Sequence, residues 1–465
     1  MKIIQEPDKA IMQVLGKGKA DRGHTCRFLK WVVKVPYDGG CLLHNYLTGE
    51  MIFFDEADNN ALEAKAWQSL IRNGGGPGYD LVRHMIENYF LVREEHDDIK
   101  LIDQVRKVIR LIKRPKEVNS FKILPTTNCN ARCYYCYEDG INKINMTEDT
   151  AHKVVDYIAG RSNGSRVTLA WFGGEPLMGR KVIETICAGL RSRDVEYGSI
   201  MTSNGYIFDE ELADQAVNSW KLNNIQITLD GTRFVYNRIK DYINPKHDPY
   251  LRVINNIRLL LARGVYVNVR LNMGLDNYDD LNNLIDDLAG EFKGQKKFSV
   301  YVDGLFQEME KDGPVKRDLI EKLKKLSARL GEIGLDTNPS KSLKLRVQGC
   351  MADSDNHRGV SPDGNIMKCE HYIDDRIVGH LESNEEDKAM LDDWKKPMTD
   401  GEFCPDCPAR PSCYRLENCP VSHPCTFDER EQLLLRNIRT MKSLYEYWKH
   451  EEMGLVPECE NNGIC

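Results

Sequence analysis

The chain has 465 residues, 41% of them hydrophobic, which is enough for several buried cores. Its 64 basic and 71 acidic residues give a net charge of −7, which excludes a global basic field for nucleic acid or anionic membrane. There is no run of about 18 apolar residues and no apolar stretch at the start, so we expect a soluble, cytoplasmic protein.

Fifteen cysteines are the unusual feature of the composition. Cytosolic reductants keep thiols open, so clustered cysteines indicate metal sites rather than disulfides. One group falls at 129–136, a second between 350 and 425, and Cys459 and Cys465 lie at the tail. Three isolated cysteines are interpreted as small buried hydrophobic residues: Cys26, Cys41 and Cys187.

Residues 28–54 alternate and turn like short antiparallel strands, with a hairpin at Asp38-Gly39-Gly40. Three stretches with helical periodicity follow, up to a linker at Arg114-Pro115. The pattern predicts a small α+β module over residues 1–115.

From Phe121 to about Val302, short apolar strands alternate with helical stretches. This alternation predicts a parallel sheet with helices outside it, closed or partly closed into a barrel, with active residues at the carboxyl ends of the strands. The predicted strands are 121–126, 167–172, 199–204, 225–230, 265–272 and 298–302, and the helices 147–161, 180–192, 209–220, 249–263 and 278–290.

The rest of the chain changes character after a helical stretch at 315–334. Residues 350–425 are dense in cysteine and turns, so we expect them to fold around metal, and an amphipathic helix follows at 428–452. The predicted domains after the first module are therefore a barrel over 116–310, a bridging helical segment over 311–345, and a cysteine-rich domain with its closing helix over 346–465.

The first cysteine group, T-N-C-N-A-R-C-Y-Y-C-Y, has the spacing C-x3-C-x2-C and is one ligand short of a four-coordinate site. Three thiolates on one loop can bind three irons of a cubane cluster and leave the fourth iron open. Zinc completed by a distant cysteine is the alternative. The next strand ends in G-G-E-P, where glycines allow close approach to a ligand and Glu175 can accept a hydrogen bond from an ammonium group.

Together these motifs resemble those of the radical S-adenosylmethionine (SAM) enzymes. The hallmark is C-x3-C-x-aromatic-C, here Cys129, Cys133, Tyr135 and Cys136. The resemblance implies a [4Fe-4S] cluster whose open iron is chelated by the methionyl group of SAM, with Glu175 holding its ammonium. Reductive cleavage of SAM would then give a 5'-deoxyadenosyl radical that abstracts a hydrogen.

Further positions follow from the same resemblance, although each could be an ordinary turn or a surface charge. Asp230, in L-D-G, is a candidate catalytic group near the substrate. The expected cofactor contacts besides Tyr135 and Glu175 are Gly173, Gly174, Pro176, Ser203, Asn204, Arg270 and Asn272.

The second cysteine field resembles the SPASM extension of this family, except that five residues rather than three separate Cys413 from Cys419. The resemblance implies two auxiliary [4Fe-4S] clusters, the second of them one ligand short and open to a substrate thiolate, to solvent or to another cysteine. Zinc ribbons are the alternative, since thiolate sites of either metal look alike in sequence. The ligands would be Cys404, Cys407, Cys413 and Cys425 for one cluster and Cys350, Cys369 and Cys419 for the other.

The first module resembles the winged-helix peptide recognition element of peptide-modifying members of the family. That resemblance implies that a leader peptide binds as a strand added to a sheet edge. A winged-helix DNA binder is the alternative, and the acidic residues Asp97, Asp98 and Asp103 on the third helix disfavour it.

The sequence thus predicts an α/β fold: a partial (β/α)6 TIM-like barrel with an N-terminal winged-helix module and a C-terminal iron-sulfur domain. We expect a maturase that forms a cysteine thioether in a ribosomally made peptide. Its electron donor would be of flavodoxin or ferredoxin type, and nucleic acid and membrane are not expected partners. A sulfatase-maturing enzyme that makes formylglycine, a carbon–carbon crosslinking enzyme, an epimerase and a non-enzymatic zinc scaffold are the alternatives.

Overall fold

The computed structural model describes residues 1–19, 24–56, 64–112, 114–115, 117–309, 314–335, 350–371, 375–383, 385–399, 401–413, 415–420 and 425–453. The chain folds into two compact units. Unit 1 consists of Met1–Arg114, Pro339–Cys350 and Pro397–Cys465, and unit 2 of Pro115–Asn338 and Met351–Lys396. The cysteine-rich stretch that the sequence groups as one domain is therefore divided between the two units.

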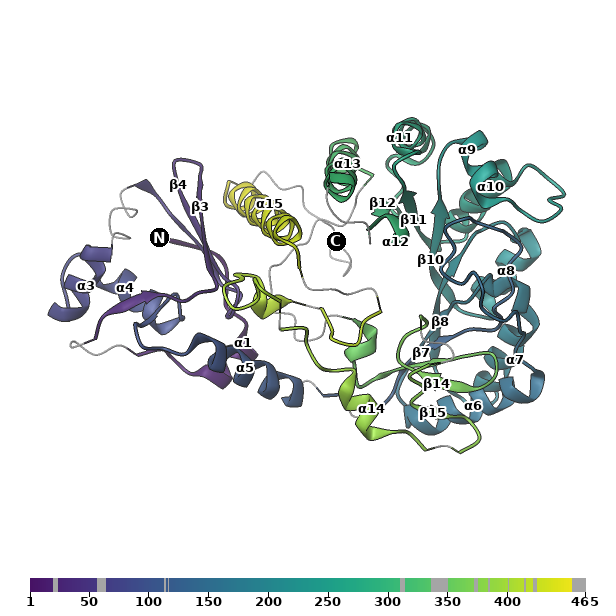
Figure 1. Cartoon of the computed structure of the whole chain (residues 1–465), viewed down its shortest axis with the longest axis horizontal. Coiled ribbons are helices and arrows are strands. Elements are labelled where there is room, and N and C mark those ends of the chain that lie inside the picture. The colour runs from purple at the N-terminus through teal and green to yellow at the C-terminus, as the bar shows by residue number, and fades with distance from the viewer. Residues whose placement is uncertain are drawn as a thin grey trace. The chain divides into compact units, whose positions relative to one another are not determined.

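Unit 2 is built on a parallel sheet, as predicted (Figure 1). Its strands pair in chain order and in parallel, and their apolar runs are buried because helices cover the outer face. All six predicted strands are present: β7 (Ser120–Ile123), β8 (Val167–Trp171), β9 (Tyr197–Ser203), β10 (Leu222–Leu229), β11 (Tyr266–Met273) and β12 (Phe298–Gly304).

Helices connect these strands and lie along the outside of the sheet (Figure 1). This arrangement brings the carboxyl ends of all six strands to one edge, which is where a parallel barrel places its reactive groups. The connecting helices are α6 (Glu148–Ser162), η2 (Pro176–Gly179), α7 (Arg180–Arg191), α8 (Glu210–Asn218), α9 (Arg233–Lys240), α10 (Pro249–Ala262) and α11 (Tyr278–Phe292), and α12 (Phe306–Met309) and α13 (Pro314–Ile333) follow β12.

A later segment of the chain extends the sheet of unit 2 beyond β7. Strand β13 (His357–Val360) pairs in parallel with β7, and β14 (Asn365–Met367) and β15 (Gly379–His380) continue the sheet in antiparallel pairing. A buried ion pair between Arg358 Nη2 and Glu386 Oε2, at 2.8 Å, lies in this extension. The short elements η3 (Met351–Asp353) and α14 (Lys388–Asp393) complete it.

Unit 1 contains the predicted α+β module. Its four-stranded antiparallel sheet has the order β1-β5-β4-β3, and the predicted hairpin turns at Asp38 and Gly39, both with positive φ. The elements are β1 (Lys2–Gln5), α1 (Lys9–Leu15), β2 (Cys26–Phe28), β3 (Val32–Tyr37), β4 (Gly40–Asn45), β5 (Met51–Phe54), α3 (Ala64–Asn73), α4 (Tyr79–Glu87), β6 (Leu91–Arg93) and α5 (Asp98–Ile112).

The last helix, α15 (Phe427–Glu452), packs on the sheet of this module. Its Met441 and Tyr445 are buried against Val35, Leu42 and Phe53, and the Tyr445 hydroxyl donates to Asp38 Oδ2 at 2.6 Å. Helix α15 thus belongs to the core of unit 1, a placement that the sequence did not predict.

The segment before α15, which contains η4 (Arg410–Ser412), also joins that core. Cys407 and Ala409 pack with Trp31 and with Ile102 of α5. Arg106, also on α5, donates from Nη2 to the carbonyl oxygen of Cys413 at 2.6 Å.

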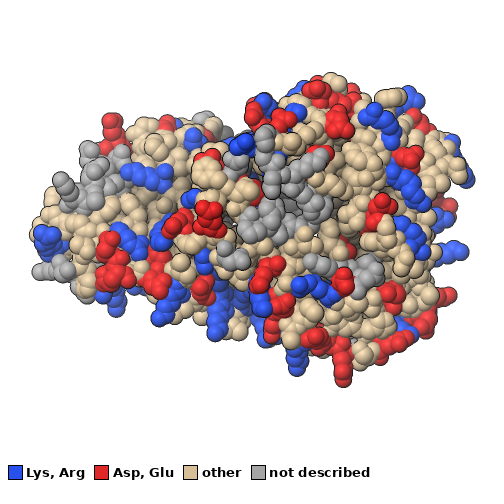
Figure 2. All heavy atoms as spheres, in the orientation of Figure 1, with Lys and Arg blue, Asp and Glu red and all other residues tan. Residues whose placement is uncertain are grey.

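The surface carries mixed charge, and no helix in the described ranges is long and apolar enough to cross a membrane. On the face drawn in Figure 2, acidic and basic side chains are interspersed. Asp98 was counted among the acidic residues that disfavour a phosphate-binding face on α5, but its side chain is buried. The carboxylate accepts hydrogen bonds from both Nη atoms of Arg27 and from the Lys30 backbone N–H, and so connects α5 to the strands before it.

Candidate active site

The first three cysteines lie on the loop that follows β7, at the carboxyl edge of the sheet. Cys129, Cys133 and Cys136 are partly exposed free thiols. The loop is anchored by the buried Thr126 and Thr127, whose hydroxyls donate to the carbonyls of Ile144 and Asn142. Burial, with smaller contributions from the Glu175 carboxylate and the nearby thiols, raises the pKa of Cys129 to about 11, so a metal must displace its proton.

Two glycines at the end of β8 allow that strand to touch the cysteine loop. A Cβ on Gly173 would meet the Thr126 carbonyl oxygen at 2.2 Å, and one on Gly174 would meet the Asn128 oxygen at 2.4 Å. The backbone N–H of Glu175 donates to that Asn128 oxygen at 2.8 Å. The close approach that these glycines permit is to the backbone of the loop, and their contact with the cofactor stays a prediction.

Glu175 is fully buried behind this contact and sits at a junction of three segments. Its Oε1 accepts from the Ser203 hydroxyl at 2.9 Å and from Leu177 N at 3.1 Å, and its Oε2 accepts from Asn204 N at 2.8 Å. Burial raises its pKa to about 7, against the lowering effect of these donors. Three of about four acceptor sites on the carboxylate are filled, so one remains for a further donor.

The end of β9 joins the same junction. The Asn204 side chain donates from Nδ2 to Asn130 Oδ1 at 2.7 Å, inside the cysteine loop. The S-N-G turn therefore links the G-G-E-P segment to the loop, and Ser203, Asn204 and Glu175 form one hydrogen-bonded group. Pro176 is the buried first residue of η2, next to Glu175.

A second buried polar group connects the loop to β10 and β11. The Tyr135 hydroxyl donates to Asp230 Oδ1 at 2.5 Å, and Asn272 Nδ2 donates to both of these oxygens at 3.0 Å. Lys240 Nζ lies 3.0 Å from Asp230 Oδ2. Of these four residues only Lys240 was missed from sequence, because a lysine that ends a basic helical stretch has no motif around it.

Arg270 lies apart from this group in its hydrogen bonding. It is half-exposed on β11, and its Nη2 is 3.2 Å from Asp303 Oδ2. Its Nε is buried and donates to none of the described residues. An oriented guanidinium with a spare donor suits a carboxylate ligand.

Four cysteines of the second field gather within unit 1. Burial raises the pKa of Cys407, and the thiols of Cys413 and Cys404 raise it further; Cys407 and Cys413 act in the same way on Cys425. This is the set that the resemblance assigned to one auxiliary cluster. Of the other predicted set, Cys350 and Cys419 belong to unit 1 and Cys369 to unit 2.

The isolated cysteines behave as predicted where the structure describes them. Cys26 and Cys41 lie in an apolar core of unit 1, and Cys187 is buried in α7. Cys459 and Cys465 are outside the described residues.

The three thiols of the loop suit a cubane cluster better than a single metal ion. Among the described residues, no group of three or more His, Cys, Asp or Glu side chains surrounds one metal position. In a cubane each thiolate binds a different iron, so its ligands need not converge on one point. Three thiols on one loop, beside a buried carboxylate with an open acceptor site, suit a cluster with a chelating amino-acid ligand.

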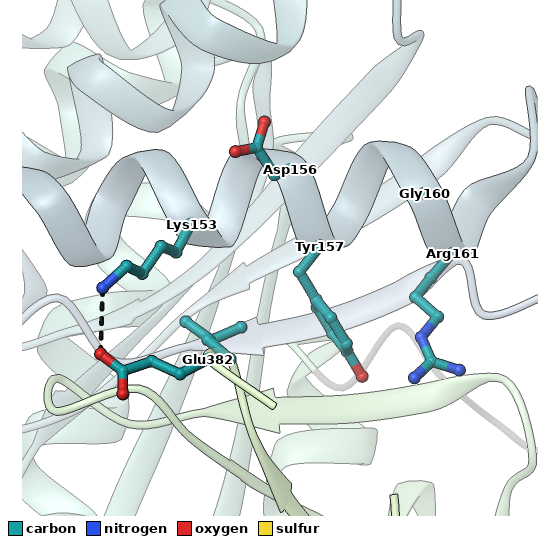
Figure 3. A pocket seen from close by; sticks show the side chains of 7 residues that line it. Lys153, Asp156, Tyr157, Gly160, Arg161 and Glu382 are labelled. Atoms are coloured by element: carbon teal, nitrogen blue, oxygen red, sulfur yellow. Dashed lines mark hydrogen bonds and ion pairs between the residues drawn. The ribbon is translucent and has the colours of Figure 1, made fainter. Parts of the chain in front are cut away.

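A separate hollow of about 600 Å3 lies between α6 and the residues after β15 (Figure 3). Each of its charged groups has a partner of opposite charge: Lys153 Nζ is 3.1 Å from Glu382 Oε1, Arg161 Nη2 is 3.4 Å from Glu386 Oε1, and Asp156 pairs with Arg193. Tyr157 donates to that same Glu386 oxygen at 2.5 Å. The hollow is on the helix side of the sheet, away from the carboxyl edge, and its charges are already neutralised.

Comparison with known proteins agrees with this geometry. Residues 123–288 match the model of the radical SAM superfamily, a span that starts in β7 and ends in α11. The chain therefore contains a radical SAM domain, a class of enzyme domain that binds S-adenosylmethionine and a [4Fe-4S] cluster.

Individual relatives are distant. The radical SAM cyclopropyl synthase TigE of Paramaledivibacter caminithermalis is 21% identical over 238 residues, which are 46% of this chain and 48% of TigE. The GTP 3',8-cyclase of Clostridium perfringens is 25% identical over 285 residues, 55% of this chain and 82% of the cyclase. The chain thus spans about half the length of TigE.

Among solved structures, anSMEcpe with bound AdoMet matches with a TM-score of 0.55 at 16% identity. The match covers 70% of this chain and 95% of anSMEcpe. At this identity the likeness shows the fold alone, and it leaves 30% of the present chain outside the match.

Proposed function

We propose that this chain is a radical SAM maturase that modifies a ribosomally made peptide, with formation of a cysteine thioether. The observation that carries the proposal is the junction at the carboxyl edge of the sheet. There the loop of Cys129, Cys133 and Cys136 is bonded to the end of β8 through Asn128 and to the end of β9 through Asn204. Glu175 lies between those two strand ends with one free acceptor site.

The three thiolates of the cysteine loop would hold a [4Fe-4S] cluster, which would supply the electron for cleavage of SAM to a 5'-deoxyadenosyl radical. Glu175 accepts from the methionyl ammonium, and Arg270, through its spare Nε donor, is available to the carboxylate. Asn272 and Asp230 hold Tyr135 beside the cluster. The fold match to a structure of anSMEcpe with bound AdoMet supports SAM as the cofactor of this fold.

The substrate reaction balances as follows. A carbon–hydrogen bond of the peptide breaks and its hydrogen atom goes to 5'-deoxyadenosine. A peptide cysteine loses its thiol proton, its sulfur bonds to the carbon radical, and one electron leaves. An auxiliary cluster on Cys404, Cys407, Cys413 and Cys425 would accept that electron. The peptide therefore loses two hydrogens in all.

The peptide substrate is inferred from two features. Among the described residues, β3 is an edge strand of the sheet in unit 1, whose order is β1-β5-β4-β3, and an extended leader could add there as a strand. A structure of anSMEcpe contains AdoMet and the Cp18Cys peptide, with a TM-score of 0.54 to this chain. A flavodoxin- or ferredoxin-type protein would supply the electron for SAM cleavage.

A sulfatase-maturing activity is the second candidate, since its expected three-cluster plan fits the same cysteine motifs. Such an enzyme would not require the α+β module of unit 1, which this chain contains. Incubation of the reconstituted enzyme with the Cp18Cys peptide decides between the two: formylglycine would establish the second candidate and displace the first.

The central test is anaerobic reconstitution with iron and sulfide, followed by reduction with SAM present. We expect 5'-deoxyadenosine from the wild-type protein and none from the variant with Cys129, Cys133 and Cys136 replaced by alanine, while that variant keeps the iron of its auxiliary sites. Cys187→Ala, a buried cysteine in α7, is the matched control and should retain cleavage. Cleavage in the triple variant, or zinc in place of iron, would overturn the proposal.

A further inference from the structure

The last residue of α9, Lys240, places a charged side chain inside the barrel, with 3% of its surface exposed. Its Nζ lies 3.0 Å from Asp230 Oδ2, 3.0 Å from the Tyr135 hydroxyl and 2.7 Å from Thr228 Oγ1. Two of its three N–H donors are hydrogen-bonded, to the Tyr135 hydroxyl and to Thr228 Oγ1, and Asp230 Oδ2 is its ion-pair partner. A buried charge needs such partners, because leaving it unpaired costs free energy.

The backbone at the same position holds a different part of the cysteine loop. Helix α9 ends at Lys240 because Asp241 has a positive φ of 42°, which turns the carbonyls of both residues away from the helix. They accept from Arg132 N at 2.9 and 3.1 Å, and the N–H of Ile243 donates to Asn130 O at 2.9 Å. The turn after α9 thus forms three backbone hydrogen bonds with residues 130–132.

One residue therefore contacts both halves of the loop. The Lys240 carbonyl oxygen accepts from Arg132 N, which lies between Cys129 and Cys133 in the chain. The Lys240 side chain donates to the hydroxyl of Tyr135, which lies between Cys133 and Cys136. Cys133 Sγ itself is 4.0 Å from the Lys240 carbonyl oxygen. With Asp230 as its counter-ion, Lys240 provides this support without leaving a net charge beside the loop.

We propose that Lys240 is a positioning residue that fixes the shape of the Cys129–Cys136 loop, and with it the geometry in which the three sulfurs hold the cluster. This inference rests on the proposed function. Nothing in the family resemblance or in the sequence motifs assigned a role to Lys240. Its position requires that the side chain be a cation long enough to span from α9 to both Asp230 and Tyr135.

The test uses the full-length reconstituted protein and measures how fast a chelator removes iron. The iron of interest is that of the first cluster, measured as the iron that the wild-type protein holds and the Cys129/Cys133/Cys136→Ala variant lacks. We expect Lys240→Met to lose it at least about tenfold faster than wild type, since breaking a buried pair strongly destabilises its surroundings. Lys240→Arg keeps a cation in reach and should stay within about threefold of wild type.

A second readout separates positioning from general stability. When SAM binds the open iron, the electron paramagnetic resonance spectrum of the reduced cluster changes. That change should be lost or weakened in Lys240→Met and kept in Lys240→Arg. The matched control is Arg358→Met, which breaks another buried ion pair of unit 2 and should lower thermal stability but leave both readouts unchanged.

If Lys240→Met does not fold, the double variant Asp230→Asn with Lys240→Met removes both charges and so leaves none unpaired. Fast iron loss from that folded double variant supports the role of Lys240. Iron loss at the wild-type rate overturns it, as does equal acceleration by Arg358→Met. A wild-type protein with no more iron than the triple cysteine variant would instead overturn the proposed function itself.

Discussion

Glu175 joins two strand ends and a 3-10 helix, and it is also the residue that we propose to bind the methionyl ammonium of SAM. It caps η2 through Leu177 N and binds Ser203 and Asn204 at the end of β9. A purely structural carboxylate would explain those three bonds, whereas a cofactor ligand must also respond to SAM. The pKa of about 7, raised by burial, makes the two roles separable by pH.

If Glu175 binds the methionyl ammonium, the dissociation constant for SAM should fall as pH rises through about 7, where the carboxyl ionises. Measurements up to about pH 7.5 keep an α-amino group mostly protonated. Glu175→Gln should weaken binding roughly 10- to 150-fold, equivalent to about 1.5–3 kcal/mol for a charge-assisted hydrogen bond, and remove the pH dependence. Equilibrium binding at a series of pH values checks both effects.

Stability should change with pH in the opposite sense. Between pH 4.5 and about 7 the Glu175 carboxyl is protonated in the native chain but ionised in the unfolded chain. Its contribution to the free energy of unfolding therefore falls as the pH rises through this range. Glu184→Gln, on α7, is the control for binding, since Glu184 bonds to Arg191 and Trp220 outside the site. An unchanged SAM affinity in Glu175→Gln would leave only the structural role.

The elements of the barrel were predictable, and the way distant segments pack was not. Strands such as 225–230 are short apolar runs bounded by turns, and that local signal sufficed for all six. Strand β13, in contrast, is four residues long and pairs with β7 more than 230 residues earlier, so its neighbour cannot be read from its own pattern. Lys240 was missed for the same reason, since its partners Tyr135 and Thr228 lie on other elements.

Helix α15 provides an element-scale prediction. Met441 is fully buried against the sheet of unit 1, with Leu42 and Phe53 among its neighbours. Met441→Ala should lower the stability of unit 1 by about 2–5 kcal/mol, because it removes apolar contacts and leaves a cavity. Hydrogen exchange at the amides of β4 and β5 measures the loss.

The control comes from the solvent side of the same helix. Leu435 is 47% exposed, so Leu435→Ala should change the free energy of unfolding by no more than about 0.5 kcal/mol. Equal exchange rates in the two variants would mean that α15 does not stabilise the sheet.

At the scale of the molecule, unit 1 combines the predicted leader-binding module with four clustered cysteines. Arg106 of α5 donates to the carbonyls of Cys413 and Arg410, and Cys407 packs beside Ile102. Removal of iron by a chelator should therefore reduce hydrogen-exchange protection in α5, because metal binding contributes folding free energy to such loops. A variant with Cys404, Cys407, Cys413 and Cys425 changed to serine should show the lower protection with or without chelator. Wild-type protection that survives complete iron removal would contradict the coupling.

The sheet of unit 1 and the helix that covers it are made at different times. About 370 residues separate the end of β5 at Phe54 from the start of α15 at Phe427. At about 5–20 residues per second, a ribosome needs roughly 20–75 s to cross that interval. Throughout it, Val35, Leu42 and Phe53 of the nascent chain lack their apolar cover. The barrel strands, in contrast, are neighbours in chain order and can pair as they emerge. During synthesis, the strands of the barrel in unit 2 can therefore assemble before the sheet of unit 1, which the ribosome makes first, is covered by α15.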